Sequence, residues 1–243
     1  MRDTRLHLDQ PLDAGLQLTL DAAATHYLKA VLRARAGHRL RVFNARDGEW
    51  RARLARLDRH DGSLEIEDQL RPAVPEPGPT LLFAPLKKAR LDWLLEKATE
   101  LGVARLQPVR CQHAVVEGSK PERLRQRIVE AVEQCERLSV PALLPETTLF
   151  AAVEAAGEGV VMADEAGGAP LLPTLAAHPA AALLVGPEGG FAAAERTLLR
   201  RLTNVFPVGL GPAILRAETA ALMLLACHRA RATSDSVSRS TMP

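Results

Sequence analysis

The sequence predicts a small β-domain followed by an α/β domain with a mainly parallel sheet. Three observations support this fold class. Short segments of alternating apolar and polar residues occupy the first 70 residues or so. A proline-rich stretch, residues 72–79, then interrupts the chain. Beyond it, short apolar runs alternate with amphipathic segments of helical period, which is typical of a parallel sheet with helical crossovers.

The first domain is predicted over residues 1–71. Residues 39–43, 50–57 and 63–67 alternate apolar and polar side chains, and Asp-Gly turns precede the second and third of these segments. This pattern is typical of strands with one buried face, and several such strands with tight turns predict a small barrel. One short helix is expected over residues 26–33.

The second domain is predicted over residues 80–232, and the Ser-rich end, residues 233–243, is expected to be disordered. Apolar runs predict its strands, which are 81–84, 103–109, 159–163, 181–185 and 205–208. Helical periodicity predicts its helices, which lie near 91–101, 121–135, 193–202 and 217–231.

Composition excludes several classes of protein. Of the 243 residues, 47% are hydrophobic, but no apolar run approaches the roughly 20 residues that cross a membrane. The N-terminus lacks the apolar core of a signal peptide. Its three cysteines form no CxxC or Cys/His cluster, so no metal site is expected. We therefore expect a cytoplasmic protein.

Positive charge is concentrated in the first domain. Residues 29–59 hold ten Lys and Arg against three acidic residues, a local charge of +7, whereas the whole chain carries +2. Two interpretations stay open from charge alone: a solvated arginine face, or a surface that binds the phosphates of a nucleic acid.

Two glycine-rich loops follow predicted strands in the second domain. Residues 183–191 read Leu-Leu-Val-Gly-Pro-Glu-Gly-Gly-Phe, and residues 209–212 read Gly-Leu-Gly-Pro. Glycine lets the backbone approach a ligand closely, so the loops predict a pocket built from main chain at the carboxyl ends of the sheet. Neither is a phosphate motif: Gly190 is not followed by Lys-Ser/Thr, and Ile214 replaces the third glycine of GxGxxG.

The second loop leads into Ile-Leu-Arg-Ala-Glu-Thr-Ala, residues 214–220. This segment has two interpretations. It is an ordinary helix start with acidic and hydroxyl residues near the positive end of the helix dipole, or Arg216, set among apolar residues, has an anionic or carbonyl partner in a functional site.

Together these segments resemble the RsmE family, the bacterial small-subunit ribosomal RNA uridine-N3 methyltransferases of the SPOUT class. Both glycine loops carry the resemblance. So do residues 96–103 (Glu-Lys-Ala-Thr-Glu-Leu-Gly-Val), 131–135 (Ala-Val-Glu-Gln-Cys) and 26–33 (His-Tyr-Leu-Lys-Ala-Val-Leu-Arg). The resemblance implies a PUA-like RNA-binding β-barrel, a SPOUT domain with a C-terminal trefoil knot, and a homodimer. It also implies S-adenosylmethionine (SAM) as methyl donor and no metal.

The resemblance implies roles for individual residues. The residues expected to bind the cofactor are Leu184, Gly186, Pro187, Glu188, Gly189, Val208, Leu210, Gly211, Ile214 and Leu215. The residues expected to bind RNA are His26, Arg33, Arg51 and Arg53. Arg216 and Glu218 are the candidate catalytic residues, with Arg216 stabilising a uracil anion. A helix N-terminus lowers the basicity of Glu218, so the proton acceptor stays unassigned.

Four positions depart from the family pattern. Ala213 stands where Arg is frequent, and Ala217 where Thr is usual. Ala192 replaces a helix-capping Ser or Thr, and Glu136 a glycine. None replaces a glycine of the two loops, so the departures concern substrate geometry more than cofactor binding.

The expected activity is SAM-dependent methylation of N3 of a uridine in 16S rRNA of the small ribosomal subunit. Two alternatives stay open: a SPOUT enzyme that acts on another RNA base, and a non-catalytic RNA-binding or ribosome-assembly factor. A small-molecule nucleotide enzyme is disfavoured because the phosphate motifs are incomplete.

Overall fold

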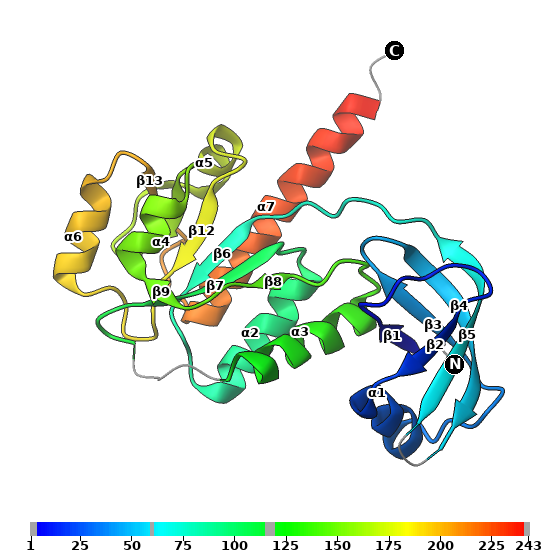
Figure 1. Cartoon of the computed structure of the whole chain (residues 1–243). Helices are drawn as coiled ribbons and strands as arrows, with labels where there is room; N and C mark the ends of the chain where they lie inside the picture. The colour runs from blue at the N-terminus through cyan, green and yellow to red at the C-terminus, as the bar shows by residue number, and fades with distance from the viewer. Residues whose placement is uncertain (1–3, 59–60, 115–119, 241–243) are drawn as a thin grey trace. The chain divides into compact units, whose positions relative to one another are not determined.

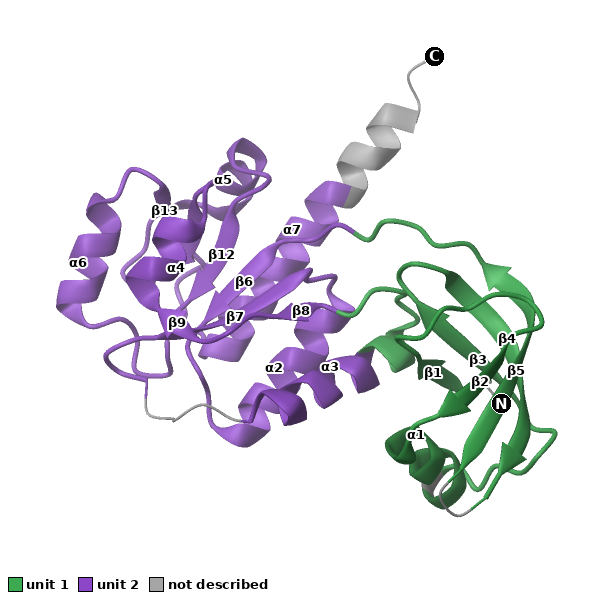
Figure 2. Ribbon diagram, in the orientation of Figure 1, with its two compact units in different colours: residues 1–76, 132–140 green, residues 77–131, 141–243 purple. Residues whose placement is uncertain are grey.

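The computed structural model describes residues 4–58, 61–114 and 120–240, which form two compact units (Figures 1 and 2). Unit 1 comprises residues 1–76 and 132–140, and unit 2 comprises residues 77–131 and 141–243. The division falls inside the proline-rich stretch at residue 76. The short segment 132–140, however, belongs to unit 1, and no composition shift in the sequence marks it.

Unit 1 is built on one five-stranded sheet with the strand order β1-β3-β4-β5-β2. Its strands are β1 (Arg5–His7), β2 (Gln17–Leu20), β3 (Arg39–Asn44), β4 (Gly48–Leu57) and β5 (Gly62–Arg71). The three predicted strands are therefore present as β3, β4 and β5. The alternation that predicted them is the burial pattern: Val42, Ala52, Leu54, Leu64 and Ile66 all point into the core.

The predicted helix over residues 26–33 needs correction. Helix α1 (Ala22–His26) begins earlier, because the Asp21 carboxylate caps it by accepting the Ala24 N–H at 2.7 Å. It continues as a π-helical turn, η1 (Tyr27–Val31), and Arg33 then takes a positive φ of 51°.

The segment 132–140 completes the core of unit 1. Its Val132 and Leu138 pack on Phe43 of β3, with Val140 against the same cluster. The Arg5 guanidinium donates to the carbonyls of Val132, Glu133 and Arg137 at the end of helix α3 (Pro121–Cys135). Those hydrogen bonds satisfy carbonyls that a helix end otherwise leaves without partners.

Unit 2 contains an eight-stranded sheet in which every pairing is parallel, as predicted. The strand order is β11-β13-β10-β12-β6-β7-β8, with β9 paired to β7. The strands are β6 (Thr80–Phe83), β7 (Arg105–Arg110), β8 (Ala142–Leu143), β9 (Thr147–Thr148), β10 (Val160–Ala163), β11 (Ala169–Pro170), β12 (Ala182–Val185) and β13 (Val205–Gly209).

Helices connect these strands, as the alternation predicts. Besides α3 they are α2 (Lys88–Glu100), α4 (Leu149–Ala155), α5 (Leu171–Ala177), α6 (Ala193–Arg201) and α7 (Ala217–Ser240). The sequence analysis missed the two seven-residue helices α4 and α5. Helix α7 packs against α2 and β12, and it continues to Ser240, into the segment whose composition predicts disorder.

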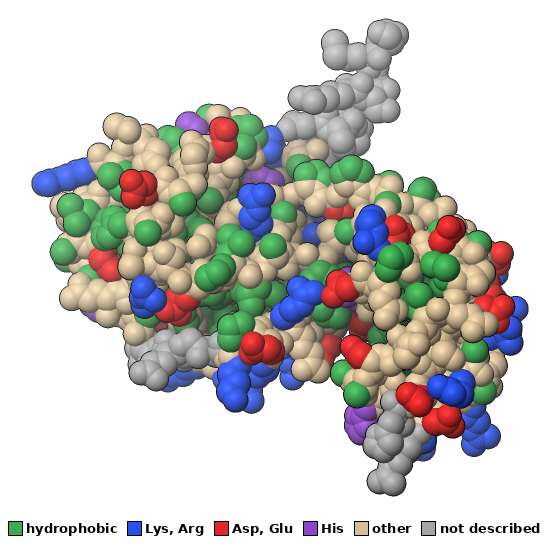
Figure 3. Space-filling model, in the orientation of Figure 1, with side chains coloured by type: hydrophobic (Ala, Val, Ile, Leu, Met, Phe, Trp, Pro, Cys, Tyr) green, Lys and Arg blue, Asp and Glu red, His purple; other side chains and the backbone are tan. Residues whose placement is uncertain are grey.

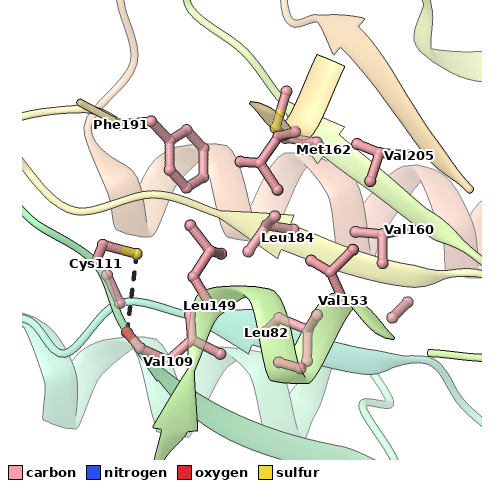
Figure 4. Close-up of a cluster of buried hydrophobic side chains, with 14 residues drawn as sticks. Leu82, Val109, Cys111, Leu149, Val153, Val160, Met162, Leu184, Phe191 and Val205 are labelled. Carbon is pink, nitrogen blue, oxygen red and sulfur yellow. Dashed lines mark hydrogen bonds between the residues drawn. The ribbon is translucent and has the colours of Figure 1, made fainter. Parts of the chain in front are cut away.

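The core of unit 2 reaches directly under the first glycine loop. Phe191, which ends that loop, packs in one cluster with Leu184 of β12, Met162 of β10 and Leu149 of α4 (Figure 4). Cys111 lies in the same cluster, and burial raises the pKa of its thiol to about 12. The buried Phe191 ring anchors the loop to the sheet.

Candidate cofactor and RNA site

A cavity of about 340 Å³ opens at the carboxyl ends of β10, β12 and β13, which are neighbours in the sheet. Its walls are the loops that follow these strands together with the first turn of α7. The first loop supplies residues 185–191, the second supplies residues 209–215, and Ala217 and Ala220 complete that side. Ligand sites of open parallel sheets lie at this edge.

Both glycine loops have backbone conformations that need glycine. Gly190 has φ of 70°, and its N–H donates to the Pro187 carbonyl at 2.9 Å, which closes the turn. Gly211 has φ of 107°. A Cβ atom on Gly186 would lie 3.0 Å from the ring of Phe191, so a glycine is needed here for the loop backbone to pack against that ring.

Most of the residues predicted to bind the cofactor line this cavity. They are Gly186, Pro187, Glu188, Gly189, Leu210, Gly211, Ile214 and Leu215. Leu184 and Val208 do not line it, because they lie inside β12 and β13 and their side chains are fully buried. Ile214 is 86% exposed at the rim.

A third wall of the cavity, which the sequence patterns did not predict, is formed by the end of β10 and the loop that follows it. Ala163, Asp164, Glu165 and Gly167 of this segment line the cavity. Asp164 is buried and pairs with Arg200 at 2.7 Å, while Glu165 pairs with Arg196 at 2.7 Å. Both arginines lie on α6. The signal was present, because a predicted parallel strand over 159–163 brings the next residues to the same edge.

The two candidate catalytic residues lie in different surroundings. Arg216 is exposed beside the cavity, and its carbonyl accepts the Ala220 N–H in the first turn of α7. Glu218 is buried and does not line the cavity. Its carboxylate faces Arg90 of α2, with 3.7 Å between Oε1 and Nε. Sequence patterns did not single out Arg90.

Two departures from the family pattern have visible consequences. Helix α6 begins without a capping hydroxyl at Ala192. Glu195 compensates in part, since its carboxylate accepts the Ala192 N–H at 3.0 Å. Glu136 follows the end of α3 and adopts φ of 63°, a conformation that glycine takes without strain.

Many arginines of the basic segment are paired with acids. Arg51 and Arg53 of β4 face Asp68, Glu65 and Glu67 of β5, and Arg39 of β3 also reaches Glu67. On the face drawn in Figure 3, blue and red side chains alternate over unit 1. Arg59 lies outside the described residues. Two of the four predicted RNA-binding residues, Arg51 and Arg53, are thus partly neutralised.

A second group of basic residues in unit 1 is not paired with acidic side chains among the described residues. It follows the turn of α1 and η1 into the next loop and consists of His26, Lys29, Arg33, Arg35 and His38, here named the 26–38 basic patch. All five are exposed, and within the described ranges none has an acidic partner. Tyr27, which is 36% exposed, lies among them in the sequence. Charge without neutralisation is what attracts a phosphate backbone.

Two family models match the chain. A model described as an RNA methyltransferase domain matches residues 75–229, and one described as an RNA methyltransferase PUA domain matches residues 20–67. A Synechocystis protein named ribosomal RNA small subunit methyltransferase E is 32% identical, with 86% of this chain and 71% of that protein covered.

The chain belongs to the RsmE family. A Rickettsia conorii protein of the same name is 29% identical over 231 residues, which cover 93% of this chain and 95% of that protein. An RsmE crystal structure from Neisseria gonorrhoeae, bound to S-adenosylmethionine, superposes with a TM-score of 0.83. It is 27% identical, with 95% of this chain and 98% of that chain covered.

The fold of this RsmE family member is therefore a mixed α/β SPOUT domain preceded by a PUA-like sheet. Among the described residues, no helix is long and apolar enough to span a membrane. That same part of the chain contains no group of three or more His, Cys, Asp or Glu side chains that could hold a metal ion.

Proposed function

We propose that this chain methylates N3 of a uridine in 16S rRNA of the small ribosomal subunit, with SAM as the methyl donor. One observation carries the proposal. The two glycine loops that carry the family resemblance, residues 183–191 and 209–212, meet at one cavity, although residues 192–208, with α6 and most of β13, separate them in the chain. The names of the relatives and the ligand of the Neisseria structure support the same function.

The cavity suits a compact, partly cationic cofactor. Its volume of about 340 Å³ lies within the range of roughly 300–1,000 Å³ that is usual for small-molecule sites. Glycine backbone offers hydrogen-bonding groups to an adenine and a ribose, and Leu210 and Leu215 offer apolar contact. Asp164, Glu165 and Glu188 also line the space. Each of them pairs with an arginine, so only part of their negative charge is available to a sulfonium or an ammonium group.

SAM supplies a methyl group that a nucleophile can take from its sulfonium. Uracil N3 carries a proton and becomes a good nucleophile only when it loses it, so stabilising the resulting imide anion is the main catalytic task. We assign this task to Arg216. It is exposed and lies in the chain between Leu215 and Ala217, which line the cavity, and it has no acidic partner in the described part of the chain. A charge-assisted hydrogen bond to a uracil carbonyl would supply the stabilisation.

The surroundings of Glu218 give a second reason, besides the helix N-terminus, against assigning it as the proton acceptor. Its carboxylate is turned away from the cavity toward Arg90. We therefore propose that Glu218 contributes to catalysis by fixing the start of α7, and the proton acceptor stays unassigned.

The RNA is proposed to bind through unit 1, with the 26–38 basic patch as the main phosphate contact. Arg33 and His26 of the original prediction belong to this patch, whereas Arg51 and Arg53 contribute less because acids face them. A homodimer with the active site at the subunit interface and a trefoil knot, both implied by the family resemblance, belong to the proposal. So does a cytoplasmic location, which the composition predicts.

The decisive experiment is methyl transfer from labelled SAM to isolated small subunits and to protein-free 16S rRNA, followed by mass spectrometry of the nucleosides. We expect 3-methyluridine at one position. The Arg216→Ala variant should lose about 10²-fold or more in rate while binding SAM normally. A different methylated base would indicate another SPOUT specificity. Absence of SAM binding in calorimetry would favour a non-catalytic RNA-binding factor.

A further inference from the structure

Arg90 connects the two segments that carry the proposed function. It lies in the first turn of α2, and its guanidinium contacts two carboxylates. Its Nη1 lies 3.0 Å from Oε1 of Glu188, and its Nε lies 3.7 Å from Oε1 of Glu218. Glu188 belongs to the first glycine loop and lines the cavity, while Glu218 lies in the first turn of α7, two residues after Arg216.

The Glu218 carboxylate depends on this contact. The residue is 8% exposed, and its Oε2 atom is buried with no hydrogen-bond partner among the described residues. An ionised carboxylate in such a place is unfavourable unless a cation lies near it. The N-terminus of α7 and Arg90 both supply positive potential, and Arg90 is the side chain that pairs with it.

The forked guanidinium is suited to holding two carboxylates at once. An arginine presents donors on different edges of one rigid plane, whereas a lysine ammonium is a single point charge on a flexible stem. Here the terminal nitrogen faces Glu188 and the inner nitrogen faces Glu218. Arg90 and Glu188 are both about one-third exposed, so their contact adds little to the stability of the fold, whereas the contact with buried Glu218 contributes more.

We propose that Arg90 is a positioning residue that locks the cofactor loop to the start of α7. The inference rests on the proposed function and deepens it. SAM binding restricts the first glycine loop and with it the carboxylate of Glu188. Because Arg90 contacts both Glu188 and Glu218, it then restricts the first turn of α7 as well. Arg216, two residues before Glu218, is thereby held in position for the RNA base. Cofactor binding and placement of the catalytic arginine are thereby coupled through one side chain.

The test compares Arg90→Gln, Arg90→Lys, Glu188→Gln and the double variant Arg90→Gln/Glu188→Gln. Arg127→Gln is the matched control, because it removes an arginine that pairs at 2.7 Å with Glu130 on α3, outside the cavity. For each protein, calorimetry gives the Kd for SAM, and steady-state assays on small subunits give kcat and KM. Thermal melting shows that the fold is retained.

We expect Arg90→Gln to raise the Kd for SAM and to lower kcat, each by about tenfold. The melting temperature should fall as well, because buried Glu218 loses its paired cation, but the protein should still be folded at the assay temperature. A displacement of about 1 Å in a site can have effects of this size or larger. Arg90→Lys should recover part of each loss. The double variant should bind SAM no more weakly than Arg90→Gln, because the second substitution removes a partner that is already lost.

Hydrogen–deuterium exchange tests the coupling without turnover. In the wild type, SAM should slow exchange at the backbone amides of Ala220 and Ala221 in the first turns of α7. In Arg90→Gln at saturating SAM, this protection should be absent. The Arg127→Gln control should behave as the wild type in every measurement.

The inference is overturned if Arg90→Gln binds SAM, turns over and shows protection in α7 as the wild type does. Additive losses in the double variant would also overturn it, since they would show that Arg90 and Glu188 act independently. If Arg90→Gln does not fold, Arg90→Lys serves as the test. A Kd for SAM and a kcat equal to those of the wild type in Arg90→Lys would show that simultaneous contact with both carboxylates is not required. Failure of the wild type to bind SAM would instead overturn the proposed function.

Discussion

The Arg5 guanidinium lies 2.6 Å from the carboxylate of Glu49, and both side chains are almost completely buried. Glu49 also accepts a hydrogen bond from Arg71 Nε at 2.6 Å, and the Arg5 guanidinium lies over the ring of Phe43, 3.9 Å from its centroid. Since Arg5 also donates to three carbonyls at the end of α3, this pair joins β1, β4 and the segment 132–140 within unit 1.

Arg5→Met should therefore strongly destabilise unit 1. The substitution removes one of the arginines that pair with buried Glu49, although Arg71 and Arg41 stay near it. It also leaves three carbonyls at the end of α3 without their donor, and together these losses are expected to cost about 3–5 kcal/mol. Urea unfolding measured by fluorescence in a Trp93→Phe background would report on unit 1 alone, because Trp50 of β4 is then the single tryptophan. The control Arg53→Met, which breaks an exposed pair with Glu65, should change stability by no more than about 1 kcal/mol. Equal effects of the two substitutions would contradict this account of Arg5.

Glu136→Gly should leave unit 1 about as stable as it is now, although it removes the contact between Glu136 and Arg41 at 3.1 Å. Relief of backbone strain offsets this loss, because a non-glycine residue in the left-handed region is disfavoured by roughly 1–2 kcal/mol. Glu136→Ala keeps the strain and loses the contact, so it should be the less stable of the two by about 1 kcal/mol. The same fluorescence assay ranks the variants, and an alanine variant as stable as the glycine variant would refute the strain argument.

Glu76 should make the stability of unit 1 dependent on acid pH. Burial alone would raise the pKa of its carboxyl, but hydrogen bonds from Ser139 and Leu138, with the charge of Arg137, outweigh burial and lower it. A lowered pKa stabilises the folded state above the ordinary value of about 4.5, and this contribution is lost as the pH falls through the lowered pKa.

We expect Glu76→Gln to be less stable than the wild type at pH 7, by on the order of 1 kcal/mol after solvent screening. The difference in urea midpoint should shrink as the pH falls below 4.5. A difference that stays constant down to pH 3 would show that the charge of Glu76 has no part in it.

The 26–38 basic patch should account for more RNA affinity than the arginines of β4. The triple variant Lys29→Ala/Arg33→Ala/Arg35→Ala should weaken binding to 16S rRNA and reduce the salt dependence of binding, because fewer counterions are released. Filter binding at several salt concentrations measures both quantities. The double variant Arg51→Ala/Arg53→Ala is the comparison, and a larger loss there would place the RNA on the sheet face instead.

Gly190→Ala should weaken cofactor binding by about tenfold or more without unfolding the protein. The new Cβ would lie 2.9 Å from Oε1 of Glu165, and the residue would keep φ near 70°. Either the loop or the Glu165–Arg196 pair at the cavity wall must move. Gly157→Ala is the control, since nothing lies within 4 Å of a Cβ there. Calorimetry with SAM gives the comparison, and equal affinities would show that the loop adapts freely.

Local patterns predicted most of the strands and helices, because alternation and helical period depend on neighbours in the sequence. The same patterns missed α4, α5, the short strands β1 and β2 of unit 1, and the two-residue strands of unit 2, all of which are too short to develop a clear period. The glycine loops were recognised through their residue types. Arg90 was missed because it acts on carboxylates about 100 and 130 positions away, and only the folded chain brings them together.

The count of charges along the sequence did not predict which arginines of unit 1 are paired with acids. A local excess of arginine predicted a basic face, but the register of β4 with β5 sets Arg53 opposite Glu65 and so cancels part of it. Acids outside the counted segment therefore decide which arginines keep their charge available. Such pairing follows from strand register, which periodicity does not provide across a turn.

The return of residues 132–140 to unit 1 has a consequence for synthesis of the protein. A nascent chain that has emerged only as far as residue 76 lacks the carbonyls that bind Arg5 and the valine and leucine that cover Phe43. Unit 1 therefore cannot close its interior when its own strands leave the ribosome. It must wait until two strands and two helices of the catalytic unit have also been translated, so the order of folding is set by position 140 and not by the proline-rich junction.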